Sequence, residues 1–276
     1  MLKAMPGTYY WLIPVGVAVG ALGTLIGAGG GFLLVPLLLL LYPADSPATI
    51  TSISLAVVCC NATAGSIAYA RVKRIDFASG GLFALATIPG AILGALSTRL
   101  VPRGVFNLLM GSILIVLAWI LVKNPDRPVP FKLGSLRPDT ERTVVELDGT
   151  SHTYRYNRAL GIGCSLVVGY ISSLLGIGGG ILHVPLLATA LDFPVHIATA
   201  TSHFVLAIMA GTGTAVHLLG GALTVGHGLR RASLLGLGVI GGAPVGAKLS
   251  TRLHGTLILR LLGAALGLVG LRLMIP

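Results

Sequence analysis

Two glycine-rich breaks interrupt apolar runs that would otherwise each read as one long membrane helix. The first is Gly-Ala-Gly-Gly-Gly at residues 27–31, followed by Val35-Pro36, and the second is Gly-Ile-Gly-Gly-Gly at residues 176–180, followed by Val184-Pro185. Consecutive glycines pack poorly inside a helix, and proline lacks a donor N–H. We therefore expect one helix to end and another to begin at each break. Unpaired backbone at membrane depth is tolerated only inside protein or along a polar cavity, so the matched breaks indicate a binding site.

The composition excludes an ordinary soluble domain. Of the 276 residues, 54% are hydrophobic and only 10% are charged, which is typical of a polytopic membrane protein. The formal net charge is +11, but the basic residues stand at the ends of apolar runs and form no stripe suited to phosphates. We therefore expect a lipid bilayer around the protein and no nucleic acid among its partners.

Hydropathy divides the chain into two membrane repeats and an aqueous linker. We expect the first repeat over residues 1–122, the linker over 123–158 and the second repeat over 159–276. The fold class is all-α and polytopic, with about four helical segments in each repeat and the first segment of each repeat broken. The predicted segments are residues 9–41, 49–70, 77–96, 105–122, 159–191, 197–219, 229–249 and 256–275.

The linker contains a strand pattern. Residues 143–147 and 150–156 alternate in polarity on either side of Asp148-Gly149. An Asp-Gly pair between alternating runs favours a type I′ turn, so the sequence predicts a small β-hairpin at the membrane surface.

Residues after the second break repeat those after the first. The segment 198–202 reads Ala-Thr-Ala-Thr-Ser and corresponds to Ala-Thr-Ile-Thr-Ser at 48–52. Internal duplication with paired broken segments is typical of secondary transporters.

The sequence leaves two topologies open. If each broken segment crosses the bilayer, each repeat has four spans and the repeats are parallel. If each break is the tip of a re-entrant hairpin, each repeat crosses three times and the repeats are inverted. Both topologies place the basic cluster at residues 71–74 on the same side as the linker, which we take to be the cytoplasm.

The doubled motif resembles that of the TauE/SafE family of sulfite exporters, also called the sulfonate uptake permease family. The resemblance rests on G-x-G-G-G-x-x-x-V-P at residues 27–36 and 176–185, on the Ala-Thr…Thr-Ser segments, and on Pro89-Gly90-Ala91 and Gly242-Ala243-Pro244. It covers nearly the whole chain outside the linker hairpin. It implies a multi-pass carrier of the inner (cytoplasmic) membrane that moves small anions such as sulfite or sulfoacetate without ATP.

Backbone N–H groups at the two breaks are the candidate anion ligands, because helix N-termini attract anions and glycine allows close approach. Nearby hydroxyls and two histidines would supply further donors or carry a proton. The alternatives are that the glycines only allow close helix crossing and that the polar side chains bond their own backbone. The candidate substrate-binding residues are Gly29, Gly30, Gly31, Gly178, Gly179, Gly180, Thr51, Ser52, Thr201, Ser202, His203 and His183.

The leading hypothesis is a secondary transporter that exports a sulfur oxyanion or sulfonate by alternating access of the two repeats. The alternatives are an anion channel and an uptake carrier for a carboxylate or other small anion. We expect no enzyme activity, because the sequence lacks HExxH, GxSxG and paired intramembrane carboxylates. We expect no cofactor and no metal, since the three cysteines lack ligand spacing. The sequence is compatible with a homo-oligomer.

Overall fold

The computed structural model describes residues 9–26, 29–123, 137–223, 227–249 and 256–274. Gly27 and Ala28 of the first break, and most of the proline-rich part of the linker, lie outside these ranges. The predicted all-α fold with a small hairpin is confirmed, and each predicted membrane segment is helical. The elements are η1 (Tyr9–Trp11), α1 (Leu12–Ile26), α2 (Gly31–Leu41), α3 (Pro47–Arg71), α4 (Phe77–Ser97), η2 (Thr98–Leu100), α5 (Arg103–Lys123), β1 (Thr140–Val145), β2 (Ser151–Tyr156), α6 (Arg158–Leu175), α7 (Gly180–Ala190), α8 (Val195–Leu219), α9 (His227–Leu249) and α10 (Thr256–Met274).

Local chemistry accounts for the helix boundaries. The Ser46 hydroxyl caps α3 by accepting from the Thr49 N–H, and Pro47 occupies the first turn, where its missing donor costs nothing. Both predicted breaks interrupt their helices. Gly30 and Gly179 precede α2 and α7 with φ of 84° and 54°, a left-handed conformation that suits glycine.

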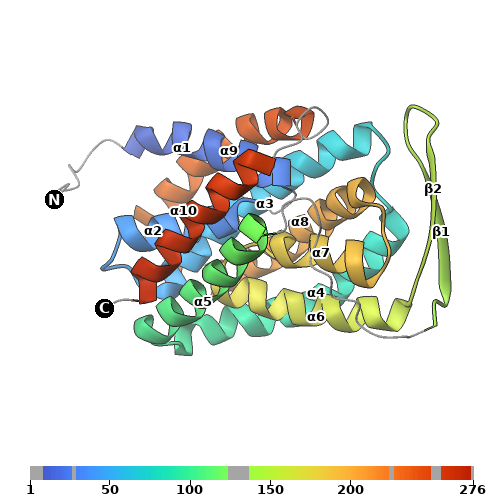
Figure 1. The fold of residues 1–276 in the computed structure, drawn as a ribbon. Helices are drawn as coiled ribbons and strands as arrows, with labels where there is room; N and C mark the ends of the chain where they lie inside the picture. Colours follow the sequence, from blue (N-terminus) through green and yellow to red (C-terminus); the bar gives the residue numbers. More distant parts are fainter. Residues whose placement is uncertain (1–8, 27–28, 124–136, 224–226, 250–255, 275–276) are drawn as a thin grey trace.

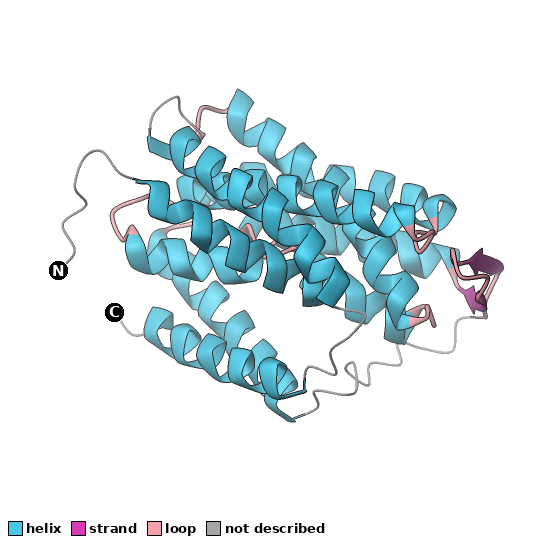
Figure 2. Cartoon of the chain, turned by 90° about the horizontal axis from the view of Figure 1, so that it is seen from above, coloured by secondary structure: helices cyan, strands magenta, loops and turns pink. Residues whose placement is uncertain are grey.

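The helices form one bundle with the hairpin at one end (Figures 1 and 2). α3 packs against α8, α1 packs against α9, and α4 packs against α6. Each of these pairs joins a helix of the first half to a helix of the second, so the two halves interlock. The duplication of the halves stays a prediction.

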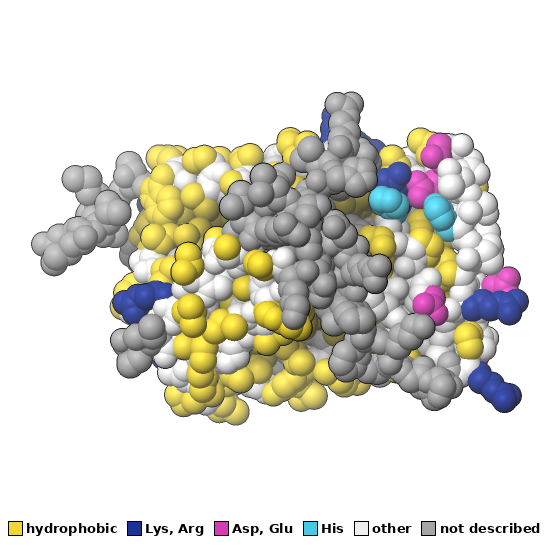
Figure 3. All heavy atoms as spheres, viewed as in Figure 1, with side chains coloured by type: hydrophobic (Ala, Val, Ile, Leu, Met, Phe, Trp, Pro, Cys, Tyr) yellow, Lys and Arg dark blue, Asp and Glu magenta, His cyan; other side chains and the backbone are white. Residues whose placement is uncertain are grey.

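The outer surface suits a lipid bilayer. Within the described residues, six helices are long and apolar enough to span a membrane. Large hydrophobic side chains such as Leu85, Trp119 and Leu268 are exposed. On the face shown in Figure 3, the acidic side chains all lie toward the hairpin end, and hydrophobic side chains cover much of the rest.

Contacts at the two ends of the bundle give the direction of the first broken segment. At one end, which we call the Asp45 end, Arg231 pairs with Asp45 at 2.6 Å. The Arg231 guanidinium lies 3.6 Å from the ring centroid of Tyr42, just after α2, and 5.5 Å from that of Tyr9, just before α1. The α1–α2 segment therefore enters and leaves at the Asp45 end.

The second broken segment enters and leaves at the opposite end, which we call the hairpin end. α6 starts directly after β2, and Phe193, which follows α7, lies with its ring 4.3 Å from that of Tyr154 in β2. Consequently α3 runs from the Asp45 end to the hairpin end, whereas α8 runs the other way. These helix directions are the ones that the re-entrant arrangement requires, and the inverted repeat itself stays a prediction.

The hairpin forms as predicted, but its turn differs. Val145 pairs with Ser151, which leaves a five-residue connection. The Gly149 N–H donates to the Glu146 carbonyl, and Gly149 has φ of 88°. Asp148 does not have positive φ, so the predicted type I′ turn is wrong. A turn from Glu146 to a left-handed Gly149 takes its place, because a type I′ turn needs positive φ at both central residues and only Gly149 of the pair has it.

Candidate functional site

The two breaks meet inside the bundle. A Cβ atom on Gly31 would stand 2.6 Å from the carbonyl oxygen of Ile177 and 2.7 Å from that of Gly176. The Ser54 hydroxyl donates to the same Gly176 carbonyl at 2.7 Å. Unwound backbone from both halves is therefore packed together, as the sequence predicts for two converging tips.

Side chains of α1 and α3 satisfy the first break. The Asn61 amide donates to the Gly29 carbonyl at 3.0 Å, and its oxygen accepts from the Thr24 hydroxyl at 3.2 Å. The Tyr69 hydroxyl donates to the Thr24 carbonyl at 3.3 Å. These groups are buried, and their mutual pairing satisfies the Gly29 carbonyl inside the protein.

A small cavity lies beside the second break. Its volume, counted as room for the centre of a water molecule, is about 10 Å³, which is enough for about one water. Four predicted site residues line it, namely Gly179, Gly180, His183 and Ser202. The remaining lining residues are Thr87, Val168, Val205, Leu206 and Met209.

Polar groups at this cavity lack partners. The His183 ring accepts or donates through Nε2 to Ser165 Oγ at 3.2 Å, but its Nδ1 is buried without a partner. The hydroxyl of Ser202 is likewise buried and unpaired. Buried polar groups are normally satisfied, so these two atoms are free to bond a water molecule or a ligand group that enters the cavity.

Backbone groups add to the same site. Among the described residues, neither the Gly179 N–H nor the Ile181 N–H has a hydrogen-bond partner. Both stand at the N-terminus of α7, an eleven-residue helix whose dipole favours negative charge. No aspartate, glutamate, lysine or arginine lines the cavity, so neutral polar groups and the α7 dipole dominate its electrostatics.

Other predicted site residues serve different contacts. The Ser52 hydroxyl donates to the Thr49 carbonyl of its own helix, and Thr201 Oγ1 accepts from the Asp76 N–H. The ring of His203 packs edge-on against that of Tyr69, and its Nε2 is buried without a partner. Thr51 lies beside Gly176 with an unpaired hydroxyl. None of these lines the cavity.

Among the described residues, the positions at the first break that correspond to His183 and Ser202 offer no unpaired polar side chain. His183 stands four residues after Gly179, whereas the residue four after Gly30 is Leu34, which is fully buried. Ser202 of α8 corresponds to Ser52 of α3, whose hydroxyl is used within its helix. The candidate site is therefore asymmetric: apart from Thr87 of α4, its lining residues belong to the second half.

Sequence reasoning missed Thr87 as a lining residue. The available signal was a hydroxyl in the middle of an apolar segment, two residues before Pro89-Gly90. Among the described residues, no group of three histidine, cysteine or acidic side chains is placed to hold a metal ion.

Comparisons with known proteins agree on one family. The family model described as "Sulfite exporter TauE/SafE" matches residues 12–273. A probable membrane transporter protein of Bacillus subtilis, YunE, is 29% identical over 95% of this chain and 96% of its own length. A probable membrane transporter protein of Methanocaldococcus jannaschii, MJ0441, is 26% identical over 94% of this chain and 93% of its own. No solved structure matches the chain.

Proposed function

Because the chain belongs to the TauE/SafE sulfite exporter family, we propose that it is a secondary transporter of a small sulfur oxyanion or sulfonate in the cytoplasmic membrane. The observation that carries the proposal is the cavity at the second break, which is lined by the start of α7 and by Ser202 and His183, each with an unpaired polar atom. Such a site offers hydrogen-bond donors to an anion without a charged side chain.

The apolar lining sets the class of anion. Val168, Val205 and Leu206 supply apolar lining that suits a short organic group, and the polar lining comes from Gly179, Gly180 and His183 at the second break and from Ser202 of α8. A sulfonate or sulfite would place its oxygens toward Gly179, Ser202 and His183. The cavity has room for about one water, so binding requires the site to widen, and the described conformation is a closed state of the alternating-access cycle.

Export needs no coupling ion. An inside-negative membrane potential drives an anion outward, whereas uptake requires a co-transported cation or proton. We therefore assign export as the direction of transport.

The test is counterflow of labelled sulfite and sulfoacetate in liposomes that contain the purified protein. Ser202→Ala removes a donor and is expected to weaken the apparent affinity by about tenfold. The matched control is Ser52→Ala, whose hydroxyl bonds its own helix and whose loss should leave affinity unchanged. Equal affinities in the two variants would show that the anion does not bind at the second break.

The same liposomes separate the other function classes. Saturable counterflow supports a carrier. A voltage-driven current far above carrier turnover would show a channel instead, and a chemically altered substrate would show an enzyme.

A further inference from the structure

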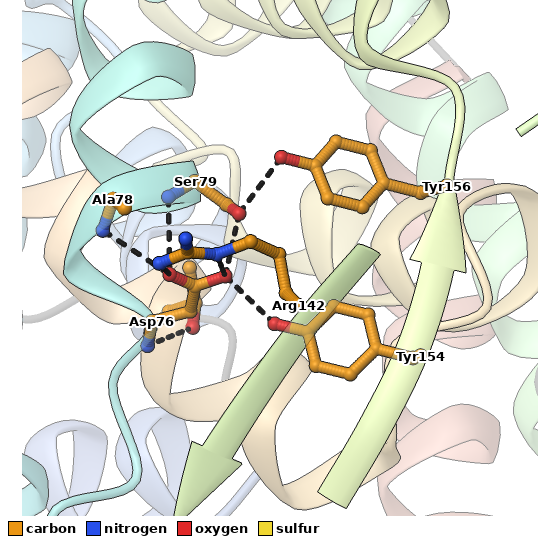
Figure 4. A network of polar contacts seen from close by, with 7 residues as sticks. Asp76, Ala78, Ser79, Arg142, Tyr154 and Tyr156 are labelled. Atoms are coloured by element: carbon orange, nitrogen blue, oxygen red, sulfur yellow. Dashed lines mark hydrogen bonds and ion pairs between the residues drawn. The ribbon is translucent and has the colours of Figure 1, made fainter. Parts of the chain in front are cut away.

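The linker hairpin is anchored to the turn before α4 by a buried carboxylate (Figure 4). The Asp76 side chain is only 1% exposed and accepts hydrogen bonds from Tyr154 Oη at 2.8 Å and from Arg142 at 3.2 Å. The Tyr156 hydroxyl lies 2.8 Å from that of Ser79. Removing the hairpin from α4 would leave a buried charge without its partners, which is costly.

A second polar anchor fastens the other end of the hairpin to the turn after α3. Arg74 pairs with Glu146 at 2.6 Å, and the Leu147 N–H donates to the Val72 carbonyl. With anchors at both ends, the hairpin and the α3–α4 turn form one rigid body.

The contact of the hairpin with the turn between α7 and α8 is of a different kind. The Phe193 ring lies 4.3 Å from that of Tyr154 and 5.3 Å from that of Tyr156. Among the described residues, no hydrogen bond or ion pair joins the hairpin to this turn. Ring contacts separate without leaving a buried charge unpaired.

The same rings lie between the cavity and the hairpin end. The ring of Phe83 is fully buried and contacts His183 at 6.1 Å, Phe193 at 6.2 Å and Tyr156 at 5.8 Å between centroids. His183 lines the cavity. The four rings of Phe83, Tyr154, Tyr156 and Phe193, here called the aromatic plug, therefore form a continuous chain of contacts from His183 at the cavity to the hairpin.

We propose that the hairpin is the fixed side of a gate, and that Phe193 on the α7–α8 turn is the moving side. Opening toward the hairpin end separates Phe193 from Tyr154 and Tyr156, while the Asp76 and Glu146 anchors keep the hairpin on α4. The Asp76 N–H also donates to Thr201 Oγ1, which ties the body of α8 to the same anchor, so α7 and its turn are the parts that move. The inference rests on the proposed function in one respect, that the cavity beside the second break is the transport site.

The test measures access to the cavity without any substrate. The gate can therefore fail its test while the transport assay succeeds, and the transport assay can fail while the gate passes its test. In a background with Cys59, Cys60 and Cys164 replaced by alanine, Val205→Cys places a thiol in the lining. A membrane-impermeant thiol reagent is added from each side of oriented vesicles. Thr153→Cys in a parallel sample reports which side the hairpin faces, because Thr153 is exposed on its outer face.

Phe193→Ala removes the moving ring and is expected to raise the labelling rate of Val205→Cys from the hairpin side by about threefold or more. Phe193→Leu keeps an apolar side chain at this position and should give a smaller rise in the labelling rate. It also provides a second variant in case the alanine variant does not fold. Thr153→Ala, which loses only the exposed contact with Thr143, should leave the rate unchanged. Unchanged labelling in both Phe193 variants, or a rise only from the opposite side, would overturn the gate.

Discussion

A Cβ atom on Gly31 would stand only 2.6 Å from the carbonyl oxygen of Ile177, so the two breaks meet backbone to backbone. This contact joins residues that are far apart in the sequence and come from opposite halves of the chain. It makes the centre of the bundle sensitive to a single methyl group, because the obstructing atom belongs to the backbone and cannot rotate away.

Gly31→Ala is expected to destabilise the protein by about 2 kcal/mol, since overpacking a closed interior forces the backbone apart. A lowered melting temperature in detergent would report the loss. Gly81→Ala is the matched control in α4, because nothing lies within 4 Å of the added methyl group. If both variants melt at the same temperature, the breaks are not in contact.

Asp76 is expected to contribute stability that depends on pH. Burial would raise the pKa of this carboxyl, but the hydrogen bonds from Ser79, Tyr154 and Arg142 outweigh burial and lower the pKa. Because the pKa of Asp76 is lower in the folded protein than in the unfolded chain, the carboxylate stabilises the fold fully at any pH above its unfolded-state pKa. This stabilisation is lost as the pH falls through its folded-state pKa.

Asp76→Asn should therefore lower the free energy of unfolding by about 2 kcal/mol at neutral pH. The difference in stability between the variant and the parent protein should shrink below about pH 4. Melting curves between pH 8 and pH 3 measure it. Glu141→Gln removes an exposed pair with Arg155 on the outer face of the hairpin and should cost less than about 0.5 kcal/mol. If the stability difference between Asp76→Asn and the parent protein stays constant down to pH 3, the ionised Asp76 carboxylate is not the stabilising group.

The inverted topology predicts which positions share a side of the membrane. Ala44→Cys, next to Asp45, and Leu229→Cys, near the start of α9, should both react with an impermeant reagent from the Asp45 end. Thr153→Cys should react only from the other side. Reaction of Leu229→Cys from the same side as Thr153→Cys would instead support the parallel topology.

The sequence alone determined where the helices lie and where they break. Glycine tracts, prolines and the Ser46 cap act on neighbouring backbone, and hydropathy depends on composition alone, so local pattern was enough for these features. The hairpin followed from alternation, although its turn type did not. The binding hypothesis for Gly179, Gly180, His183 and Ser202 also came from position relative to the second break.

Only the tertiary structure decided the direction of the broken segments and the asymmetry between the two breaks. Thr201 and Ser202 are neighbours in sequence, yet one bonds the Asp76 N–H and the other faces the cavity. Charge counting did not distinguish the topologies, whereas the Asp45–Arg231 pair, formed by residues 186 positions apart, does. The physical reason is that such contacts depend on how distant helices pack, and packing is a property of the whole bundle that no local pattern of residues encodes.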